Sequence, residues 1–443
     1  MKKTNDFGKD SIPLLVLKTS VPFMLAQLVN VLYSIVDRIY VGNIPVIGAD
    51  SLAGAGICAP IITLLSSFAT LVGIGGSVFF SVRLGAGDEK SARRILANSF
   101  SLLLILSAIL TVVFLLTKSH LLNWFGASEV TFPYADAYLT IYTLGTFFAL
   151  LSLGMMTTLI GAGVNIVLDP VFIFVFKMNI AGAAVATVIA QMCSCIFVLC
   201  TLKRKKMRIP LAIARPERVI VRRIFAIGFS PFVILATDSI IIIAMNAVLQ
   251  YYGGKEYGDT LITAATIVQS YMLLITSPML GITGGSQPLI SYNYGANQAA
   301  RIRKTVFCVL MLCICFTTVM FLVSRLIPEF FVQIFTSDPE YRELAVWGIR
   351  VFTMMIIPLS FQYVFVDSLT ALGMTGKSLA LSLFRKSLYF LSTCVLPAVL
   401  TANACFYAEP VADGVASVVS TVVFFFVWKK YLRGDGRLME IKV

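Results

Sequence analysis

The stretch Gly75-Gly-Ser-Val-Phe-Phe-Ser-Val-Arg-Leu-Gly-Ala86 recurs in altered form as Gly284-Gly-Ser-Gln-Pro-Leu-Ile-Ser-Tyr-Asn-Tyr-Gly-Ala296, and a basic cluster follows each copy. The offset is 285 − 76 = 209 residues at one glycine and 295 − 85 = 210 at another. The same offset joins three more pairs of positions, namely Pro22/Pro231, Asp37/Asn246 and, at 210, Phe125/Phe335. A constant offset over most of a chain indicates an internal repeat of about 210 residues.

The composition shows what kind of repeat this is. Of the 443 residues, 58% are hydrophobic and only 13% are charged, and the mean hydropathy is +0.90. A soluble protein has roughly a quarter charged residues, so soluble classes are excluded and a polytopic helical membrane protein remains. We predict twelve membrane helices, in the apolar runs 12–41, 53–82, 97–117, 134–154, 155–176, 180–202, 222–250, 260–290, 306–328, 344–372, 378–403 and 406–428.

Twelve helices and one repeat predict two six-helix lobes of parallel orientation, because six is an even number. We place the N-lobe at 1–209, a basic connector at 210–221 and the C-lobe at 222–443. Parallel repeats are a transporter architecture, with the substrate site near the midplane. The register breaks after Gly154, where about 17 residues of the second half, around 363–379, have no counterpart. The hairpin between the fourth and fifth helices is therefore expected to be unusually tight, whether by deletion or by a missing segment.

The basic residues are distributed unevenly between the loops. With both termini and every second loop on one side, 28 Lys and Arg residues fall there and 35 − 28 = 7 elsewhere. By the positive-inside rule this side is cytoplasmic, so both termini are expected there. The run Lys203-Arg-Lys-Lys206 then acts as a topology anchor, although it also fits an anionic-lipid or nucleic-acid patch.

Acidic residues inside the apolar runs are candidates for function, because charges are costly at membrane depth. Asp37 and Asp169 stand out, since Tyr33 precedes the first by one helical turn and Asn165 precedes the second in the same way. Two carboxylates in one poorly hydrated site cannot both ionise cheaply, so we expect at least one to hold a proton near neutral pH. Alternatively, their oxygens bind Na⁺. The structural alternatives are that Asp37 pairs with Arg38 and that Asp169 braces a kink at Pro170.

Other charged residues are assigned less directly. Asp238 is either part of a substrate cavity or structural, and Asp367 is a weaker candidate. Arg385 and Lys386 are expected near the inner start of the eleventh helix, and Glu409 and Asp413 are expected to be solvated at the outer start of the twelfth. The nine cysteines lie inside apolar runs and the single histidine, His120, lies beside an outer loop. We therefore expect no metal centre other than Na⁺ at Asp37, Asp169 and Asn165, and no enzyme.

Six features together give a resemblance to a known family. They are Pro22, Tyr33-Ser-Ile-Val-Asp37-Arg-Ile-Tyr-Val-Gly42, the loop Gly85-Ala-Gly87, Asn165-Ile-Val-Leu-Asp169-Pro170, Gly182-Ala-Ala-Val-Ala-Thr187 and Gln287-Pro-Leu-Ile-Ser-Tyr-Asn-Tyr-Gly295. With them the chain resembles a multidrug and toxic compound extrusion (MATE) transporter of the bacterial DinF-like and MepA-like branches. The resemblance implies an N-lobe cation site at Tyr33, Asp37, Asn165, Asp169 and Thr187, and a helix that bends at Pro22. We place Asp238, Asn246 and Gln287 in a candidate substrate cavity of the C-lobe.

The resemblance implies an antiporter that exports cationic or amphipathic drugs in exchange for H⁺ or Na⁺ by alternating access. The alternative is a flippase of the same broad superfamily for anionic lipid-linked sugars, which favours Lys or Arg rather than Asp in its cavity. We expect no cofactor beyond the coupling ion and no nucleic-acid partner. We also expect a monomer in the bacterial inner membrane.

Overall fold

The computed structural model describes residues 6–42, 44–45, 47–125, 127, 129–151, 155–202, 212–334 and 339–432, and these are helical with short connections and no strands. The long helices are α1 (Ile12–Gly42), α2 (Gly48–Gly85), α3 (Glu89–Trp124), α7 (Asn179–Leu202), α8 (Arg218–Gly295), α9 (Ala299–Leu326), α13 (Thr375–Val399) and α14 (Ala408–Val427). The shorter ones are α4 (Phe132–Leu144), α5 (Thr146–Leu151), α6 (Met155–Pro170), α10 (Pro328–Val332), α11 (Pro339–Phe352) and α12 (Ile356–Ala371). Short π or 3-10 turns complete the order at η1 (Val171–Val175), η2 (Thr353–Met355), η3 (Ala402–Tyr407) and η4 (Trp428–Leu432).

Ten helical segments of the described chain are long and apolar enough to cross a membrane. The all-helical membrane fold is thus confirmed, whereas the count of twelve spans is not reached. The difference falls on the predicted fourth and fifth helices, because Gly145 separates α4 from the six-residue α5. The 16 residues of α6 rise only about 24 Å, less than the roughly 30 Å hydrocarbon core. The predicted tight turn falls on 152–154, outside the described residues.

The chain divides into two compact units. Unit 1 comprises Met1–Met24, Gly85–Gly87 and Ala236–Val443, and unit 2 comprises Leu25–Leu84 and Asp88–Leu235. The lobe boundaries drawn above describe the sequence repeat rather than these contacts, and they stay a prediction. The division crosses α1 directly after Pro22 and crosses the long α8 before its left-handed residue Gly254 (φ 70°).

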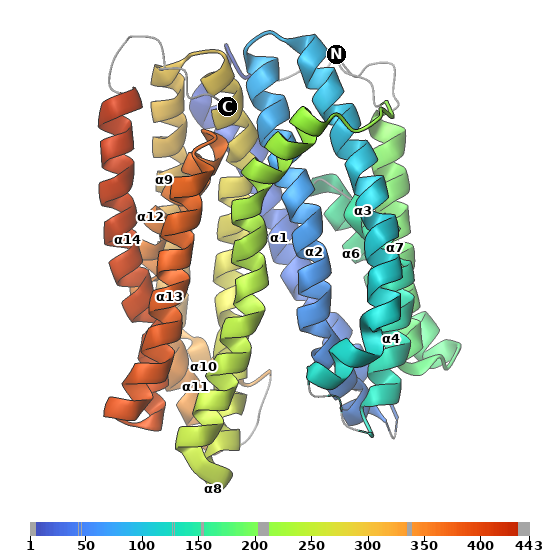
Figure 1. Ribbon diagram of the computed structural model, residues 1–443. Helices are drawn as coiled ribbons and strands as arrows, with labels where there is room; N and C mark the ends of the chain where they lie inside the picture. The colour runs from blue at the N-terminus through green and yellow to red at the C-terminus, as the bar shows by residue number, and fades with distance from the viewer. Residues whose placement is uncertain are drawn as a thin grey trace. The chain divides into compact units, whose positions relative to one another are not determined.

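Unit 2 packs α6 and α4 against α7, and α3 against α4 (Figure 1). Small residues allow these helices to approach closely. An added Cβ at Gly145 would lie 2.4 Å from the Val188 side chain, and one at Gly182 would lie 2.8 Å from the backbone of Phe172. Gly145, where α4 ends, therefore lies directly against α7.

Unit 1 packs α12, α13 and α14 side by side, with α9 against α12 (Figure 1). One buried cluster joins Ile12 and Leu15 at the start of α1 to Ile282 and Leu289 of α8. A second cluster centres on residues of α8, α11, α12 and η3, including Met245, Tyr271, Ile349 and Phe406. The start of α1 is thus part of the same hydrophobic core as the second part of α8.

The same kind of close backbone contact between helices occurs inside each unit. In unit 2, an added Cβ at Gly75 would lie 2.2 Å from the Ile224 carbonyl oxygen, and one at Gly228 would lie 1.8 Å from that of Leu71. In unit 1, an added Cβ at Gly285 would lie 2.8 Å from the Thr19 carbonyl oxygen. The added Cβ at Gly75 would also lie 3.0 Å from the Gly228 amide nitrogen. Since 285 − 75 = 210 and 228 − 19 = 209, the contact of Gly75 with Gly228 corresponds in the repeat, to within one residue, to that of Gly285 with Thr19. Each unit therefore holds the second helix of one half against the first helix of the other.

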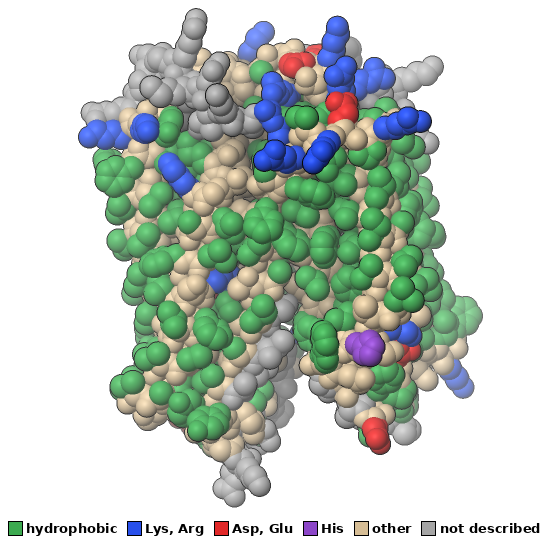
Figure 2. All heavy atoms as spheres, in the orientation of Figure 1, with side chains coloured by type: hydrophobic (Ala, Val, Ile, Leu, Met, Phe, Trp, Pro, Cys, Tyr) green, Lys and Arg blue, Asp and Glu red, His purple; other side chains and the backbone are tan. Residues whose placement is uncertain are grey.

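The helices expose apolar side chains along their length. Leu116 and Val112 of α3 and Phe425 and Phe426 of α14 are exposed, as expected for side chains that face lipid. Figure 2 shows Lys and Arg side chains gathered near one end of α2 and α3, beyond a broad region of apolar side chains. This separation supports a membrane-spanning arrangement of these helices.

Candidate functional site

The predicted N-lobe residues lie together in unit 2, on three helices. α1 carries Tyr33 and Asp37, α6 carries Asn165 and Asp169, and α7 carries Thr187. Each of the first two helices presents its pair four residues apart, on one face. Pro170 ends α6, and the chain continues in the π turn η1. We call these five residues the unit 2 acidic site.

Asn165 connects two of the helices that form the site. Its amide nitrogen donates to Asp169 Oδ1 at 3.0 Å and to Thr187 Oγ1 at 3.3 Å. Asn165 and Asp169 are each only 1% exposed. The amide therefore uses both its hydrogens on buried acceptors, which fixes the orientation of the Asp169 carboxyl group.

The carboxyl groups of Asp37 and Asp169 are close enough to hydrogen-bond to one another. Within the described residues, Asp37 Oδ1 and Asp169 Oδ2 are buried without a partner, as is Asn165 Oδ1. Two ionised carboxylates have no hydrogen to donate, so a shared proton would supply the missing donor. The same unpaired oxygens are also the type of ligand that a hard cation takes. The geometry thus brings together the predicted site residues and leaves several of their oxygens without a donor or cation.

Two tyrosines of α4 belong to this environment and were missed in the sequence. The rings of Tyr138 and Tyr142 stack at a centroid distance of 6.4 Å, and Gln191 Nε2 of α7 donates to Tyr142 Oη at 3.4 Å. Tyr138 lies within electrostatic range of Asp37 and Tyr33. The available signal was the four-residue spacing of Tyr134, Tyr138 and Tyr142, which marks one helical face.

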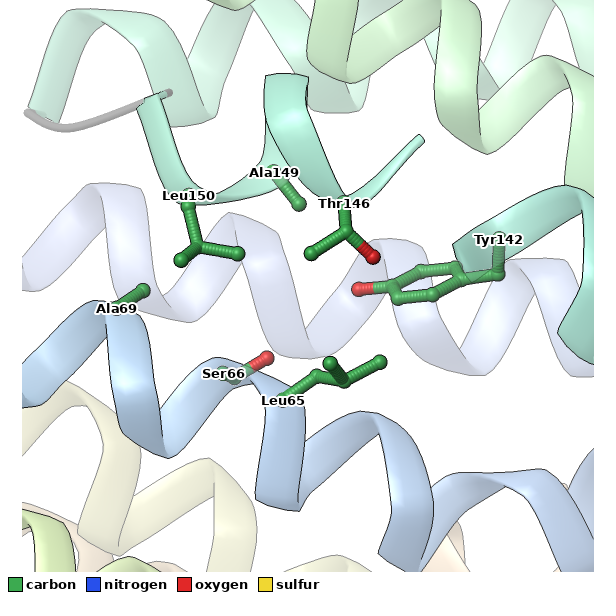
Figure 3. Close-up of a pocket in the computed structure, with 7 residues that line it drawn as sticks. All are labelled: Leu65, Ser66, Ala69, Tyr142, Thr146, Ala149 and Leu150. Carbon is green, nitrogen blue, oxygen red and sulfur yellow. The ribbon is translucent and has the colours of Figure 1, made fainter. Parts of the chain in front are cut away.

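A small pocket opens beside Tyr142. It has about 240 Å³ of empty space and is lined by Leu65, Ser66, Ala69, Tyr142, Thr146, Ala149 and Leu150. In Figure 3 the hydroxyl groups of Tyr142, Thr146 and Ser66 lie around this space, and the remaining lining atoms are apolar. The pocket is smaller than the roughly 300–1,000 Å³ of a typical ligand site, so it marks only a gap in the packing of α2 against α4 and α5.

The candidate cavity residues of the C-lobe lie in unit 1 and have other partners. Asp238 forms an ion pair with Lys386. Gln287 is buried and hydrogen-bonds to Asp367. The side chain of Asn246 lies outside the described residues. The structure therefore places Asp238 and Gln287 in separate contacts, and their assignment to one substrate cavity stays a prediction.

Two expectations for unit 1 were wrong. Glu409 and Asp413 are not solvated, because they are 8% and 0% exposed and both accept hydrogen bonds from Arg385. Arg385 and Lys386 are not at the start of their helix, since Arg385 lies 385 − 375 = 10 residues into α13. The signal available in the sequence was the four-residue spacing of the two acids, which places both on the α14 face that meets α13.

The fold and the buried acidic site define the class: a multi-pass helical membrane protein with the repeat architecture of a transporter. The protein-family model MatE matches residues 22–188 and 235–395, which is more than half of the chain. The chain belongs to the MatE family of MATE transporters.

Characterised relatives and solved structures agree with this assignment. The chain is 24% identical to the multidrug export protein MepA of Staphylococcus haemolyticus and 22% identical to that of Staphylococcus aureus MSSA476, covering 98% of each chain. A crystal structure of MATE in complex with MaL6 has a TM-score of 0.90 at 20% identity, covering 97% of this chain and 99% of that one. An outward-facing MATE family transporter of the MOP superfamily has a TM-score of 0.88 at 20% identity, with the same coverage. The structures show that the fold is shared along nearly the whole chain.

Proposed function

We propose that this chain exports cationic or amphipathic compounds from the cell by antiport with H⁺ or Na⁺. The observation that carries the proposal is the close pair of Asp37 and Asp169, in which each carboxyl group has one buried oxygen without a partner among the described residues. MepA of Staphylococcus haemolyticus, which is similar along its whole length, is named a multidrug export protein. Arg38 lies within electrostatic range of Asp37, and two carboxyl groups outnumber this one cation at the unit 2 acidic site, which favours a cationic rather than an anionic substrate.

In this proposal the coupling ion binds at the unit 2 acidic site. Asn165 holds Asp169 and Thr187 in place, and the ion supplies the positive charge that the two carboxyl groups lack. Tyr33 lies within electrostatic range of both carboxyl groups and is a further hydroxyl ligand or donor. Loss of the ion leaves two like charges in a buried site, which favours a rearrangement of α1 relative to α6.

Pro22 is the proposed bending point of α1. It lies inside the helix, where proline removes a backbone hydrogen bond. The two compact units divide α1 two residues later, between Met24 and Leu25. A bend here would let the segment that carries Tyr33 and Asp37 move while the start of α1 keeps its contacts in unit 1.

The proposed orientation places both termini in the cytoplasm of a bacterial cell, in the inner membrane. Arg385 and Lys386 lie inside α13 rather than in a loop. Without them, 28 − 2 = 26 basic residues remain on the proposed cytoplasmic side, against 7 elsewhere. The excess of Lys and Arg on the proposed cytoplasmic side therefore remains when these two residues are left out. We propose a monomer without a cofactor.

The test is efflux of a cationic dye from cells that express the chain, driven by a pH gradient or by a Na⁺ gradient. We expect Asp37→Asn and Asp169→Asn each to reduce efflux to the background of cells without the chain. Asp136→Asn is the matched control, because Asp136 also lies in unit 2 but is partly exposed and paired with Lys118. Wild-type efflux by both site variants, at equal expression, would refute the proposed coupling site.

A further inference from the structure

Unit 1 contains a buried ionic cluster that the proposed coupling site does not use. Arg385 of α13 donates from Nε to Asp413 Oδ1 at 2.7 Å and from Nη2 to Glu409 Oε1, both on α14. Arg385 is 7% exposed, and Asp413 is fully buried. We call Arg385, Glu409 and Asp413 the α13–α14 cluster.

The α13–α14 cluster lies at membrane depth. Arg385 is 10 residues from the start of the 25-residue α13, which places it about 15 Å along a helix of about 37 Å. α13 and α14 pack directly against each other (Figure 1). Ionised groups in such a position need compensation by opposite charge, because neither water nor lipid headgroups surround them.

The charges of the cluster and its surroundings do not balance. Arg385 faces two carboxylates. The adjacent Lys386 lies within electrostatic range of both, but its ion pair is with Asp238, whose side chain is 38% exposed. If all are ionised, two cations meet three carboxylates, and 2 − 3 leaves one excess negative charge. Among the residues that the structure describes, the other titratable groups that face the cluster are the hydroxyls of Tyr363 and Tyr389, which contribute no positive charge. The more distant Asp367 of α12 would only add to the excess.

Asp413 supplies a second, independent observation. Its Oδ1 accepts from Arg385, but its Oδ2 is buried with no partner among the described residues. A fully buried ionised carboxylate with one unpaired oxygen is costly. Protonation of that oxygen makes the group neutral and cancels the excess charge.

We propose that the α13–α14 cluster is a second proton-binding site, which holds one exchangeable proton on the Asp413 carboxyl group. The proton is transferred from hydronium in the bulk solvent, which becomes water, and bonds to Oδ2, so that the carboxylate becomes a carboxylic acid while Arg385 remains paired with Glu409. Na⁺ is disfavoured because it needs several oxygen ligands, whereas Asp413 Oδ1 and Glu409 Oε1 are occupied by the guanidinium group.

The proposal concerns proton binding at equilibrium and stands without transport. Only its consequence, a second proton taken up in each export cycle, rests on the proposed function. A matched control exists in the same unit, because Arg342 and Glu329 also form an arginine–carboxylate pair, 3.3 Å apart, with Glu329 59% exposed. An exposed carboxylate has no need of a proton near neutral pH.

The experiment is infrared spectroscopy of the purified full chain in lipid nanodiscs at about pH 7, where ordinary carboxyl groups are ionised. The spectrum of the unchanged chain minus that of Asp413→Asn should contain one carboxylic-acid carbonyl band that shifts in D₂O. Glu409→Gln should remove the same band, because Arg385 then neutralises Asp413 without a proton. Glu329→Gln should remove only an ionised carboxylate band.

Three results would overturn the proposal. Persistence of every carboxylic-acid band in Asp413→Asn would show that this residue is ionised. Loss of the band in Asp413→Asn but not in Glu409→Gln would show that charge excess is not the cause. Disappearance of the band on addition of Na⁺ would assign the site to Na⁺ instead. Asp37→Asn separates this proposal from the proposed function, since it should abolish efflux and leave the Asp413-dependent band unchanged.

Discussion

The contact between Gly228 and Leu71 supports a sharp prediction about stability. Both residues lie in unit 2, on α8 and α2, and an added Cβ at Gly228 would lie 1.8 Å from the Leu71 carbonyl oxygen. Such contacts below 3.0 Å essentially do not occur, so the two atoms must separate by at least 3.0 − 1.8 = 1.2 Å in Gly228→Ala. The atom in the way is backbone, so no side-chain rotation can relieve the clash.

The expected magnitude follows from two opposing effects. Overpacking a closely packed contact costs about 1–3 kcal/mol, whereas replacement of glycine by alanine inside a helix contributes about 0.5–1 kcal/mol of stability. Gly163→Ala in α6 isolates the second effect, because nothing lies within 4 Å of a Cβ added there. We therefore expect Gly163→Ala to be slightly stabilised and Gly228→Ala to be destabilised.

The assay is thermal unfolding of the purified variants in detergent. The fraction of folded protein that remains after heating to each temperature is measured by size-exclusion chromatography. The unfolding temperature should rise for Gly163→Ala and fall for Gly228→Ala, relative to the unchanged chain. Equal shifts of the two variants would refute the reasoning, because they would show that α2 and α8 are not in backbone contact at Gly228. The unfolding temperature should fall further in Gly228→Leu than in Gly228→Ala, because the larger side chain requires a larger separation of the two helices.

Three further predictions concern hydrogen bonds. Asn165→Ala should lower dye efflux about tenfold, because each buried acceptor that loses its donor costs about 1–3 kcal/mol and about 1.4 kcal/mol is a factor of ten. Arg301 Nη2 donates to the carbonyl groups of Phe7 and Asp10 at 2.8 Å, so Arg301→Ala should speed chymotrypsin cleavage after Phe7, whereas the exposed Lys304→Ala should not. The Ser91 hydroxyl and backbone amide hold the pKa of Asp88 below its usual range, so this cap stabilises α3 at neutral pH. That contribution is lost as the pH falls through the lowered pKa, and Asp88→Ala should make stability less dependent on acid pH in a thermal scan.

Helical spacing and hydropathy were sufficient to predict most of the fold. Apolar length predicted the spans that the structure contains, and the break in the repeat predicted that the fourth and fifth helices would depart from the others. The four-residue spacing of Asn165 and Asp169 correctly placed both on one helical face, where they hydrogen-bond. That α1 approaches α6 could not be derived from either periodicity. The pairing of Asp37 with Asp169 was a hypothesis about acidic residues at membrane depth, and the family resemblance supported it.

The charged groups of unit 1 show why the remaining predictions failed. A prediction from hydropathy places each charged residue near the closest helix end. For this reason Arg385, Glu409 and Asp413 were predicted to lie near solvent. Their burial depends on a contact between α13 and α14 that joins residues 24 and 28 positions apart. Hydropathy along the sequence treats these residues as three separate charges, whereas in the folded chain they form one ionic cluster.

The two acidic sites differ in how their negative charge is compensated, and this difference predicts different ion selectivity. In the unit 2 acidic site, Asp169 is held by a neutral amide, so the compensating charge must come from an exchangeable ion. In the α13–α14 cluster, the guanidinium group of Arg385 is a permanent cation that occupies one oxygen of each carboxylate. Only a proton then fits the remaining Asp413 oxygen, whereas the unit 2 acidic site has oxygens free for either H⁺ or Na⁺. Titration with Na⁺ at constant pH should therefore change the infrared bands that depend on Asp37 or Asp169 if Na⁺ is the coupling ion, and in either case should leave the band that depends on Asp413 unchanged.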